Sequence, residues 1–299
     1  MKFTVSIEMN KLDQSLKNRY LFILAFLIGV LSFLSIYGIS PLNPFCDNFI
    51  FWGYDEKDIN QHYAGWVLFL TDDWHFPLGY TDKISSGTII SYTDSIPLFA
   101  IFFKFVFKLI NYQGTFQYFG IYTLLCYVLQ AFAAGLIIRR KTNNIIVLFF
   151  AMILLCFSPI LMERAFRHTA LGSQFLILFA IYSLLKGRDS NYRKFPWIFA
   201  LLGCVAITTH PYFLPLVFGF CFVYFIESVR YGEKKYLKVN SISFIFSIGI
   251  TLIVGYLIGV IGHGVNVSRG IIGFYSMNLN AIINSTSYGG YKWSAFLKT

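Results

Sequence analysis

The sequence predicts an all-α polytopic membrane protein, and three observations lead to this prediction. Hydrophobic residues make up 57% of the 299 residues and charged residues only 13%, whereas about a quarter of the residues of a soluble domain are charged. The hydrophobic residues are gathered in runs of helical length. The charged residues lie between these runs, so the net charge of +10 indicates orientation in a membrane and not a nucleic-acid partner.

Seven apolar runs are predicted to cross the bilayer as helices. The first, 20–39, has the roughly 20 residues that a membrane-spanning helix needs. It follows the basic segment 1–19 without a cleavage motif, which indicates an uncleaved signal anchor. The other six predicted spans are 117–138, 144–161, 171–185, 196–209, 212–229 and 241–262.

A further apolar run, 96–110, is predicted to lie on the membrane surface. A helix of this length would be about 22 Å long, while the hydrocarbon core is about 30 Å thick. If this run does not cross, 15 of the 24 Lys and Arg residues fall on one side, which the positive-inside rule identifies as the cytoplasm. These basic residues lie in 1–19, 139–143, 186–195 and 230–238. Lys104 is expected to extend its ammonium group to the lipid headgroups.

This topology places the N-terminus in the cytoplasm and a long first loop, 40–116, outside. The loop is predicted to hold two interfacial helices, one beginning at about Lys57 and one over 96–110. Asp94 is expected to cap the second of these helices. All five histidines then lie at or beyond the outer surface: His62, His75, His168, His210 and His263.

Residues 1–299 are interpreted as one transmembrane module. Its external C-terminal loop, 263–299, has no folded domain of its own and is interpreted as cut short. The five cysteines show no paired spacing, so neither a disulfide framework nor a zinc motif is predicted.

The strongest candidate for chemistry is the first-loop stretch GYDEKDINQHYAGWVLFLTDDW, which contains Asp55, Glu56 and Asp58. In a helix from about Lys57, Asp58 shares one face with Gln61 and His62. A carboxylate at a membrane surface can act as general base on an acceptor hydroxyl group. The alternative is a solvated acidic loop in which Asp58 caps the helix.

Two basic positions of the external loops are candidates for phosphate binding. Arg164 and Arg167, with Glu163 and His168, follow the third span, and a bidentate phosphate contact would explain arginines on the outer side. The alternative is an ion pair between one of these arginines and the first-loop carboxylates. Arg269, in the final loop, could likewise reach a phosphate or be solvated.

The sequence leaves open the role of His210 and whether the chain binds a divalent cation. His210 lies at the turn between the fifth and sixth spans, where it could satisfy backbone groups or take part in function. Asp58 and His62 could supply two ligands to a divalent cation, but their spacing matches no recognised metal motif. No metal-binding residues are therefore assigned, and a divalent cation is the one cofactor that the sequence leaves open.

This arrangement resembles the GT-C fold of lipid-linked sugar transferases. The shared features are a cytoplasmic N-terminus, an acidic motif opening an interfacial helix of a long first external loop, and short alternating loops thereafter. The stretches DINQHYAGW, DSIPLFAIFFK, FQYFGIYTLLCYVLQ and SMNLN are similar to an uncharacterised bacterial family of GT-C-like membrane proteins.

The resemblance implies transfer of a sugar from a polyprenyl phosphate or polyprenyl diphosphate donor. The acceptor would be a glycan, lipid or protein, and transfer would occur with inversion on the outer face of the bacterial inner (plasma) membrane. Asp58 would be the general base, with Asp55 and Glu56 as second choices. The residues expected to bind substrate are His62, Gln61, Trp66, Arg164, Arg167, His168, His210 and Arg269.

The chain departs from the resemblance at two points. Glu163 stands where several relatives have Asp, and the later spans and C-terminal domain of typical members are missing. A non-catalytic transporter or lipid-handling protein, or an inactive truncated fragment, is therefore the alternative. Transporters place ionisable residues near the middle of the bilayer, whereas the predicted spans have almost none, which favours the enzyme.

Overall fold

The computed structural model describes residues 2–48, 50, 58–84, 87–193 and 197–263, and structural statements below refer to these residues. Six segments among them are helical, long and apolar enough to cross a membrane. They are Arg19–Tyr37 of α1 (Lys2–Tyr37), α5 (Phe119–Arg139), Ile145–Arg164 with α6 (Ile145–Cys156) and α7 (Pro159–Arg164), Thr169–Asp189 with η3 (Thr169–Gly172) and α8 (Phe175–Asp189), α10 (Phe213–Tyr231) and α11 (Lys234–Ile258).

These helices confirm the all-α polytopic membrane class. The predicted span 196–209 corresponds to α9 (Ile198–Thr209), whose 12 residues make it shorter than the other six. At 1.5 Å per residue α9 is about 18 Å long. It packs against α8, α10 and α11, and its crossing of the membrane stays a prediction.

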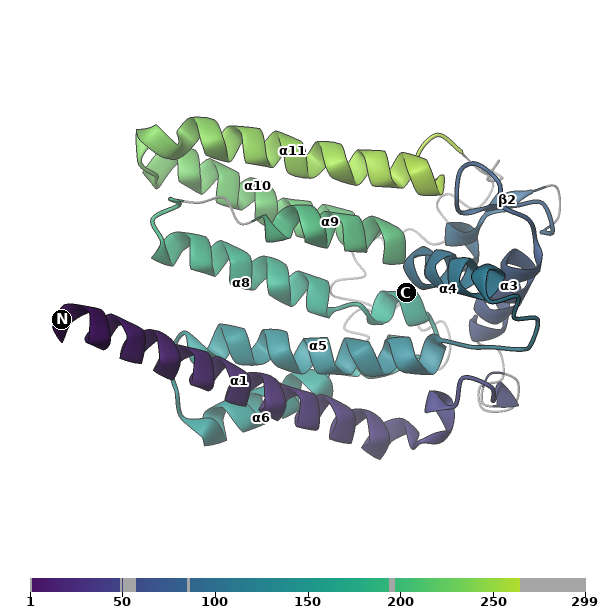
Figure 1. The fold of residues 1–299 in the computed structure, drawn as a ribbon, viewed down its shortest axis with the longest axis horizontal. Helices are drawn as coiled ribbons and strands as arrows, with labels where there is room; N and C mark the ends of the chain where they lie inside the picture. Colours follow the sequence, from purple (N-terminus) through teal and green to yellow (C-terminus); the bar gives the residue numbers. More distant parts are fainter. Residues whose placement is uncertain (1, 49, 51–57, 85–86, 194–196, 264–299) are drawn as a thin grey trace, which may run out of the picture. The chain divides into compact units, whose positions relative to one another are not determined.

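The helices run alternately in opposite directions within residues 1–263 (Figure 1). One end holds the start of α1 and the turns after α5, α8 and α10, where Arg140 contacts Asp189 at 2.7 Å and Arg188 contacts Glu227 at 2.6 Å. The start of α1 and these three turns correspond to the four predicted basic segments, which therefore lie at one end. The first loop and the turns after α7 and α9 lie at the opposite end.

Close contact between α1 and α5 depends on a small residue. A Cβ atom added at Gly29 would come within 2.6 Å of the Cα atom of Val128. Small residues let membrane helices approach closely enough for backbone packing. At the end of α1, Gly38 adopts a φ of 70°, which stops the helix, and its N–H donates to the carbonyl of Leu34.

Both helices predicted in the first loop are present: α3 (Ile59–Thr71) and α4 (Pro97–Leu109). They pack against each other, and α4 also packs against α9. Trp66 of α3 is fully buried, donates its indole N–H to the carbonyl of Phe116 at 2.8 Å and contacts the Tyr118 ring. This side chain ties α3 to the entry of α5.

The expectation that Lys104 reaches lipid headgroups is wrong. Its side chain is fully buried and donates to the backbone carbonyl of Asp73 at 2.9 Å. The ammonium group lies 4.0 Å from the Phe69 ring centroid and 4.7 Å from that of Trp74. Contacts with two aromatic faces and a carbonyl stabilise the buried ammonium group within the first loop. Burial lowers the pKa of Lys104 to about 8.

A short hairpin joins α3 to α4. Strands β1 (Tyr80–Thr81) and β2 (Thr88–Ile89) pair antiparallel, and η2 (Ile90–Thr93) follows. The N–H of Leu78 donates to the carbonyl of Leu257, near the end of α11. This bond attaches the first loop to the last helix of the described region.

Candidate functional site

Five ionisable side chains from four segments meet at the loop end of the helices. Asp58 and His62 come from the start of α3, Asp94 from the turn after η2, His168 from the turn after α7, and His210 from the turn between α9 and α10. We refer to these five residues as the polar cluster. Four of them were predicted as site residues, and Asp94 was not.

Asp94 is held in the cluster by an unusual backbone conformation. Its φ of 53° and ψ of 24° lie in the left-handed region, which Asp tolerates better than most side chains. The neighbouring Ser95 hydroxyl donates to the carbonyl of His62 at 2.5 Å and contacts the Thr93 hydroxyl at 2.8 Å. Gly65 makes room for this turn, because a Cβ atom there would come within 2.4 Å of the Thr93 hydroxyl oxygen.

The predicted capping role of Asp94 is therefore wrong. Ile96 is the residue that precedes α4, and α4 has no side-chain cap among the described residues. The Asp94 carboxylate instead lies between two imidazoles, with Oδ1 at 3.3 Å from Nε2 of His210 and Oδ2 at 3.8 Å from Nε2 of His62. Burial opposes ionisation of Asp94, but its pKa is nevertheless lowered, and the hydrogen bond with His210 is the largest of the effects that outweigh burial.

His62 is buried without a hydrogen-bond partner. Its side chain is 1% exposed, and neither ring nitrogen has a hydrogen bond within the described part of the chain. Burial lowers the pKa of His62 to about 4, against the opposing effects of Asp94 and Asp58. The imidazole is therefore neutral near pH 7. An unpaired buried polar group costs about 1–3 kcal/mol, so the unpaired His62 ring is an unusual feature of this site.

Asp58 contacts His168 and does not cap α3. It occupies the position before Ile59, yet its carboxylate makes no capping bond to the described helix backbone. Oδ2 of Asp58 instead lies 3.0 Å from Nδ1 of His168, with the two side chains 47% and 30% exposed. This exposed pair joins the first loop to the loop after the third span.

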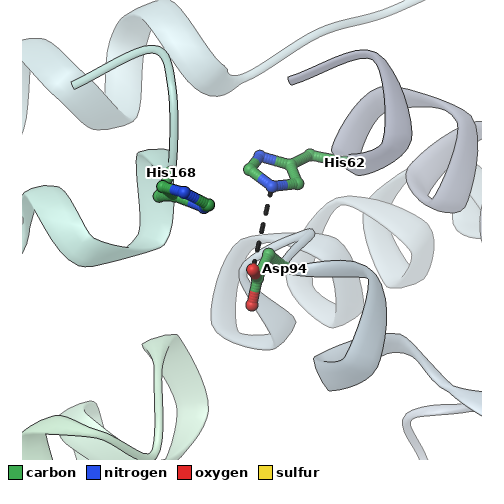
Figure 2. A group of neighbouring side chains, drawn as sticks. All are labelled: His62, Asp94 and His168. Atoms are coloured by element: carbon green, nitrogen blue, oxygen red, sulfur yellow. Dashed lines mark ion pairs between the residues drawn. The ribbon is translucent and has the colours of Figure 1, made fainter. Parts of the chain in front are cut away.

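His62, Asp94 and His168 converge on one small space (Figure 2). The His62 and His168 ring centroids are 6.5 Å apart. Each of the three residues offers one metal-ligand atom, and these atoms lie within 4.8 Å of one another. The sequence contained no spacing that signals this group, because its members are brought together by the packing of three separate segments.

His210 satisfies a backbone group of its turn and also faces Asp94. Its Nδ1 accepts the backbone N–H of Tyr212 at 3.2 Å, which satisfies the turn. The proton of the neutral ring must then be on Nε2, and this nitrogen faces Asp94. His210 therefore orients the Asp94 carboxylate while holding the start of α10.

Each remaining predicted residue either has no hydrogen bond or ion pair with the cluster among the described residues or lies outside the described chain. Arg167 pairs with Glu163 four residues earlier, and not with a first-loop carboxylate. Arg164 is half-buried at the end of α7 and has no ion pair to the described residues. Gln61 is exposed, and the burial of Trp66 leaves it no surface for a substrate. Asp55, Glu56 and Arg269 lie outside the described residues.

An apolar groove leads toward the polar cluster. It has a volume of about 310 Å³ and follows α9 from Ile198 to Thr209, between α4, α5 and α8. Its lining includes Leu98 of α4, and Thr209 directly precedes His210. The polar cluster thus lies beside an apolar groove whose lining reaches Thr209, the neighbour of His210.

Comparison with known proteins places the chain in a family by sequence. No curated protein and no solved structure matched the chain. The sequence model of one family, described as a domain of unknown function (DUF6311), matches residues 26–299. Because this match extends over most of the sequence, the chain belongs to the DUF6311 family.

Proposed function

We propose that the chain is a membrane glycosyltransferase that transfers a sugar from a polyprenyl phosphate or polyprenyl diphosphate donor to an acceptor hydroxyl group. The observation that carries this proposal is the pairing of an exposed carboxylate, Asp58, with His168 at the end of an apolar groove. The carboxylate suits proton removal, and the groove suits a polyprenyl tail.

In the proposed reaction the acceptor oxygen attacks the anomeric carbon of the sugar. The bond between that carbon and the donor phosphate oxygen breaks, and its electron pair leaves with the phosphate. The acceptor proton passes to Asp58, which returns it to water after the product departs. A positioned general base contributes about 10²–10⁴-fold to such a step. His168, in contact with Oδ2 of Asp58, keeps the carboxylate in place.

The leaving phosphate gains negative charge and needs cationic groups nearby. Arg164 is half-buried in α7, close in sequence to His168, and has no ion pair to the described residues, so its charge is free for this role. Arg167 already forms an ion pair with Glu163 through one of its guanidinium nitrogens. Arg269 remains part of the proposal as a residue outside the described chain.

The orientation of the site follows from the basic segments. The polar cluster lies at the end opposite the turns that contain Arg140 and Arg188. Under the positive-inside rule the cluster faces the extracytoplasmic side of the bacterial inner membrane, with the N-terminus in the cytoplasm. In this arrangement α9 is the fifth of seven spans, and α3 and α4 lie at the membrane surface.

The proposal is tested by donor turnover with the full chain in lipid nanodiscs. The donors are a panel of polyprenyl phosphate and polyprenyl diphosphate sugars, each compared with the same sugar phosphate on a short alkyl chain. With acceptors that carry a free hydroxyl group present, we expect at least one long-chain donor to release its polyprenyl phosphate or diphosphate, detected by mass spectrometry, and the short-chain partner to react far more slowly because it cannot fill the groove. Binding of the long-chain lipids without release from any donor would contradict the proposal and favour a lipid-handling protein.

A further inference from the structure

We propose that His62, Asp94 and His168 form a binding site for a divalent transition-metal ion of the zinc class. Two imidazoles and one carboxylate come from α3, the turn after η2 and the turn after α7, and their ligand atoms lie within 4.8 Å of one another. Zinc binds such atoms at about 2.0–2.2 Å.

The orphaned ring of His62 is the observation that points to a ligand. A buried imidazole normally pairs with protein or water, yet neither nitrogen of His62 does so in the described part of the chain. Figure 2 shows the ring directed toward the space that it shares with Asp94 and His168. A metal ion in that space would bind one of the two nitrogens and so reduce the cost of burying the ring without partners.

Neighbouring residues orient the other two ligands correctly. The Nδ1 atom of His168 faces Asp58 at 3.0 Å, so an N–H donated to this carboxylate leaves Nε2 as the ligand atom. The Nε2–H of His210 faces Oδ1 of Asp94, while Oδ2 faces His62. A carboxylate behind a ligating histidine is the usual arrangement that fixes the ring tautomer and raises ligand basicity.

The donor set selects the class of metal. Imidazole nitrogens suit zinc, iron, cobalt and nickel, whereas magnesium and calcium favour an all-oxygen set. Three protein ligands leave one tetrahedral position open, as in catalytic zinc sites. One carboxylate and two neutral imidazoles leave a bound divalent ion with a net positive charge. The open position would therefore accept an anionic oxygen, and its assignment to the donor phosphate rests on the proposed function.

A second group in the first loop, Asp72, His75 and Asp82, supplies the internal control. The Asp72 oxygens accept the Thr81 hydroxyl at 2.7 Å and the backbone N–H groups of Asp82 and Asp73 at 2.8 and 2.9 Å. These bonds lower the pKa of Asp72 despite its burial. The carboxylate is thus already occupied in stabilising the turn, so His75 can be changed without touching the proposed site.

The test measures metal binding by the full chain in nanodiscs, with no donor present. Protein stripped with EDTA is dialysed against Zn²⁺ or Mg²⁺ and analysed by elemental mass spectrometry, and Co²⁺ is then titrated to record its visible d–d absorption. We expect about one Zn²⁺ per chain, little Mg²⁺, and a Co²⁺ spectrum of low coordination number. His62→Gln and Asp94→Asn should abolish the Co²⁺ spectrum, and His75→Gln should retain it.

A variant beside the proposed metal site and the unmodified chain provide two further measurements of metal binding. Asp58→Ala, which removes the partner of a ligating histidine, should weaken Co²⁺ binding by about 10–100-fold without abolishing it. An unmodified chain that stays metal-free after dialysis would overturn the proposal, as would an unchanged Co²⁺ spectrum in His62→Gln. Since donor turnover is not measured, failure of sugar transfer would leave these results unaffected.

Discussion

Replacing Asp58 by Asn is expected to lower the rate of sugar transfer by about 10²–10⁴-fold, the usual contribution of a general base. The amide has the shape of the carboxylate and can still accept a hydrogen bond from Nδ1 of His168, so the geometry of the pair is kept. What is lost is the ability to take the acceptor proton. The measurement is turnover of the best long-chain donor under saturating acceptor.

The matched control is the same substitution at Asp73 in the same loop. That side chain is 94% exposed and contacts Lys108 at 3.6 Å, an exposed ion pair of small energetic weight. Asp73→Asn should therefore transfer sugar at the unmodified rate. Equal rates for Asp58→Asn and the unmodified chain would remove Asp58 as the base, whatever the metal content of the site.

The largest effect on stability is expected for Trp66→Ala. The indole is fully buried, contacts the Tyr118 ring at a centroid distance of 5.1 Å and donates to the carbonyl of Phe116. Removing a buried tryptophan side chain costs about 3–5 kcal/mol through lost contacts and the cavity left behind. The unpaired carbonyl of Phe116 adds to this cost.

Thermal unfolding in detergent can be followed with a thiol-reactive dye, because Cys126, Cys156 and Cys221 are free and buried in the folded chain. Trp66→Ala should unfold at a clearly lower temperature than the unmodified chain. Trp197→Ala, at a side chain that is 57% exposed, should shift the transition much less. If the two variants unfold alike, then Trp66 does not anchor α3, and its earlier interpretation as a substrate contact regains weight.

Hydropathy predicted the six long apolar helices well because each lies in an almost unbroken apolar run, and the local signal alone determines such a helix. The two helices expected in the first loop are also present, with α3 and α4 within a few residues of the expected bounds, and their position at the membrane surface stays a prediction. The break between α6 and α7 was not predicted. It falls at Ser158 and Pro159, where the proline ring permits a helix start but interrupts the helix before it.

Four of the five members of the polar cluster were predicted as site residues, but their contacts with one another were not. Asp58, His62 and His168 stood out as chemically able residues in polar intervals. Asp94 was misread because Asp before Pro97 has the pattern of a helix cap, whereas a left-handed turn held by Thr93 and Ser95 directs it at His62. Such a turn depends on contacts with α3, which no local pattern reports.

Lys104 shows the same limit. A lysine in an apolar surface helix normally extends its charge to headgroups, and the sequence offers no sign of the alternative. Its actual partners, the Phe69 and Trp74 rings and the carbonyl of Asp73, lie about thirty residues earlier in the loop. Long-range packing of this kind decides which polar groups are structural and which remain available for chemistry.

The most direct test of the account is a cryo-electron microscopy map of the chain in nanodiscs with a long-chain polyprenyl phosphate. The account predicts the phosphate beside His62, Asp94 and His168, with the polyprenyl tail in the groove along α9. A cavity of about 640 Å³ at the opposite end, lined by Lys186 and Trp197, is the competing location. A headgroup bound there, with the polar cluster left empty, would contradict the assignment of sugar transfer to this cluster.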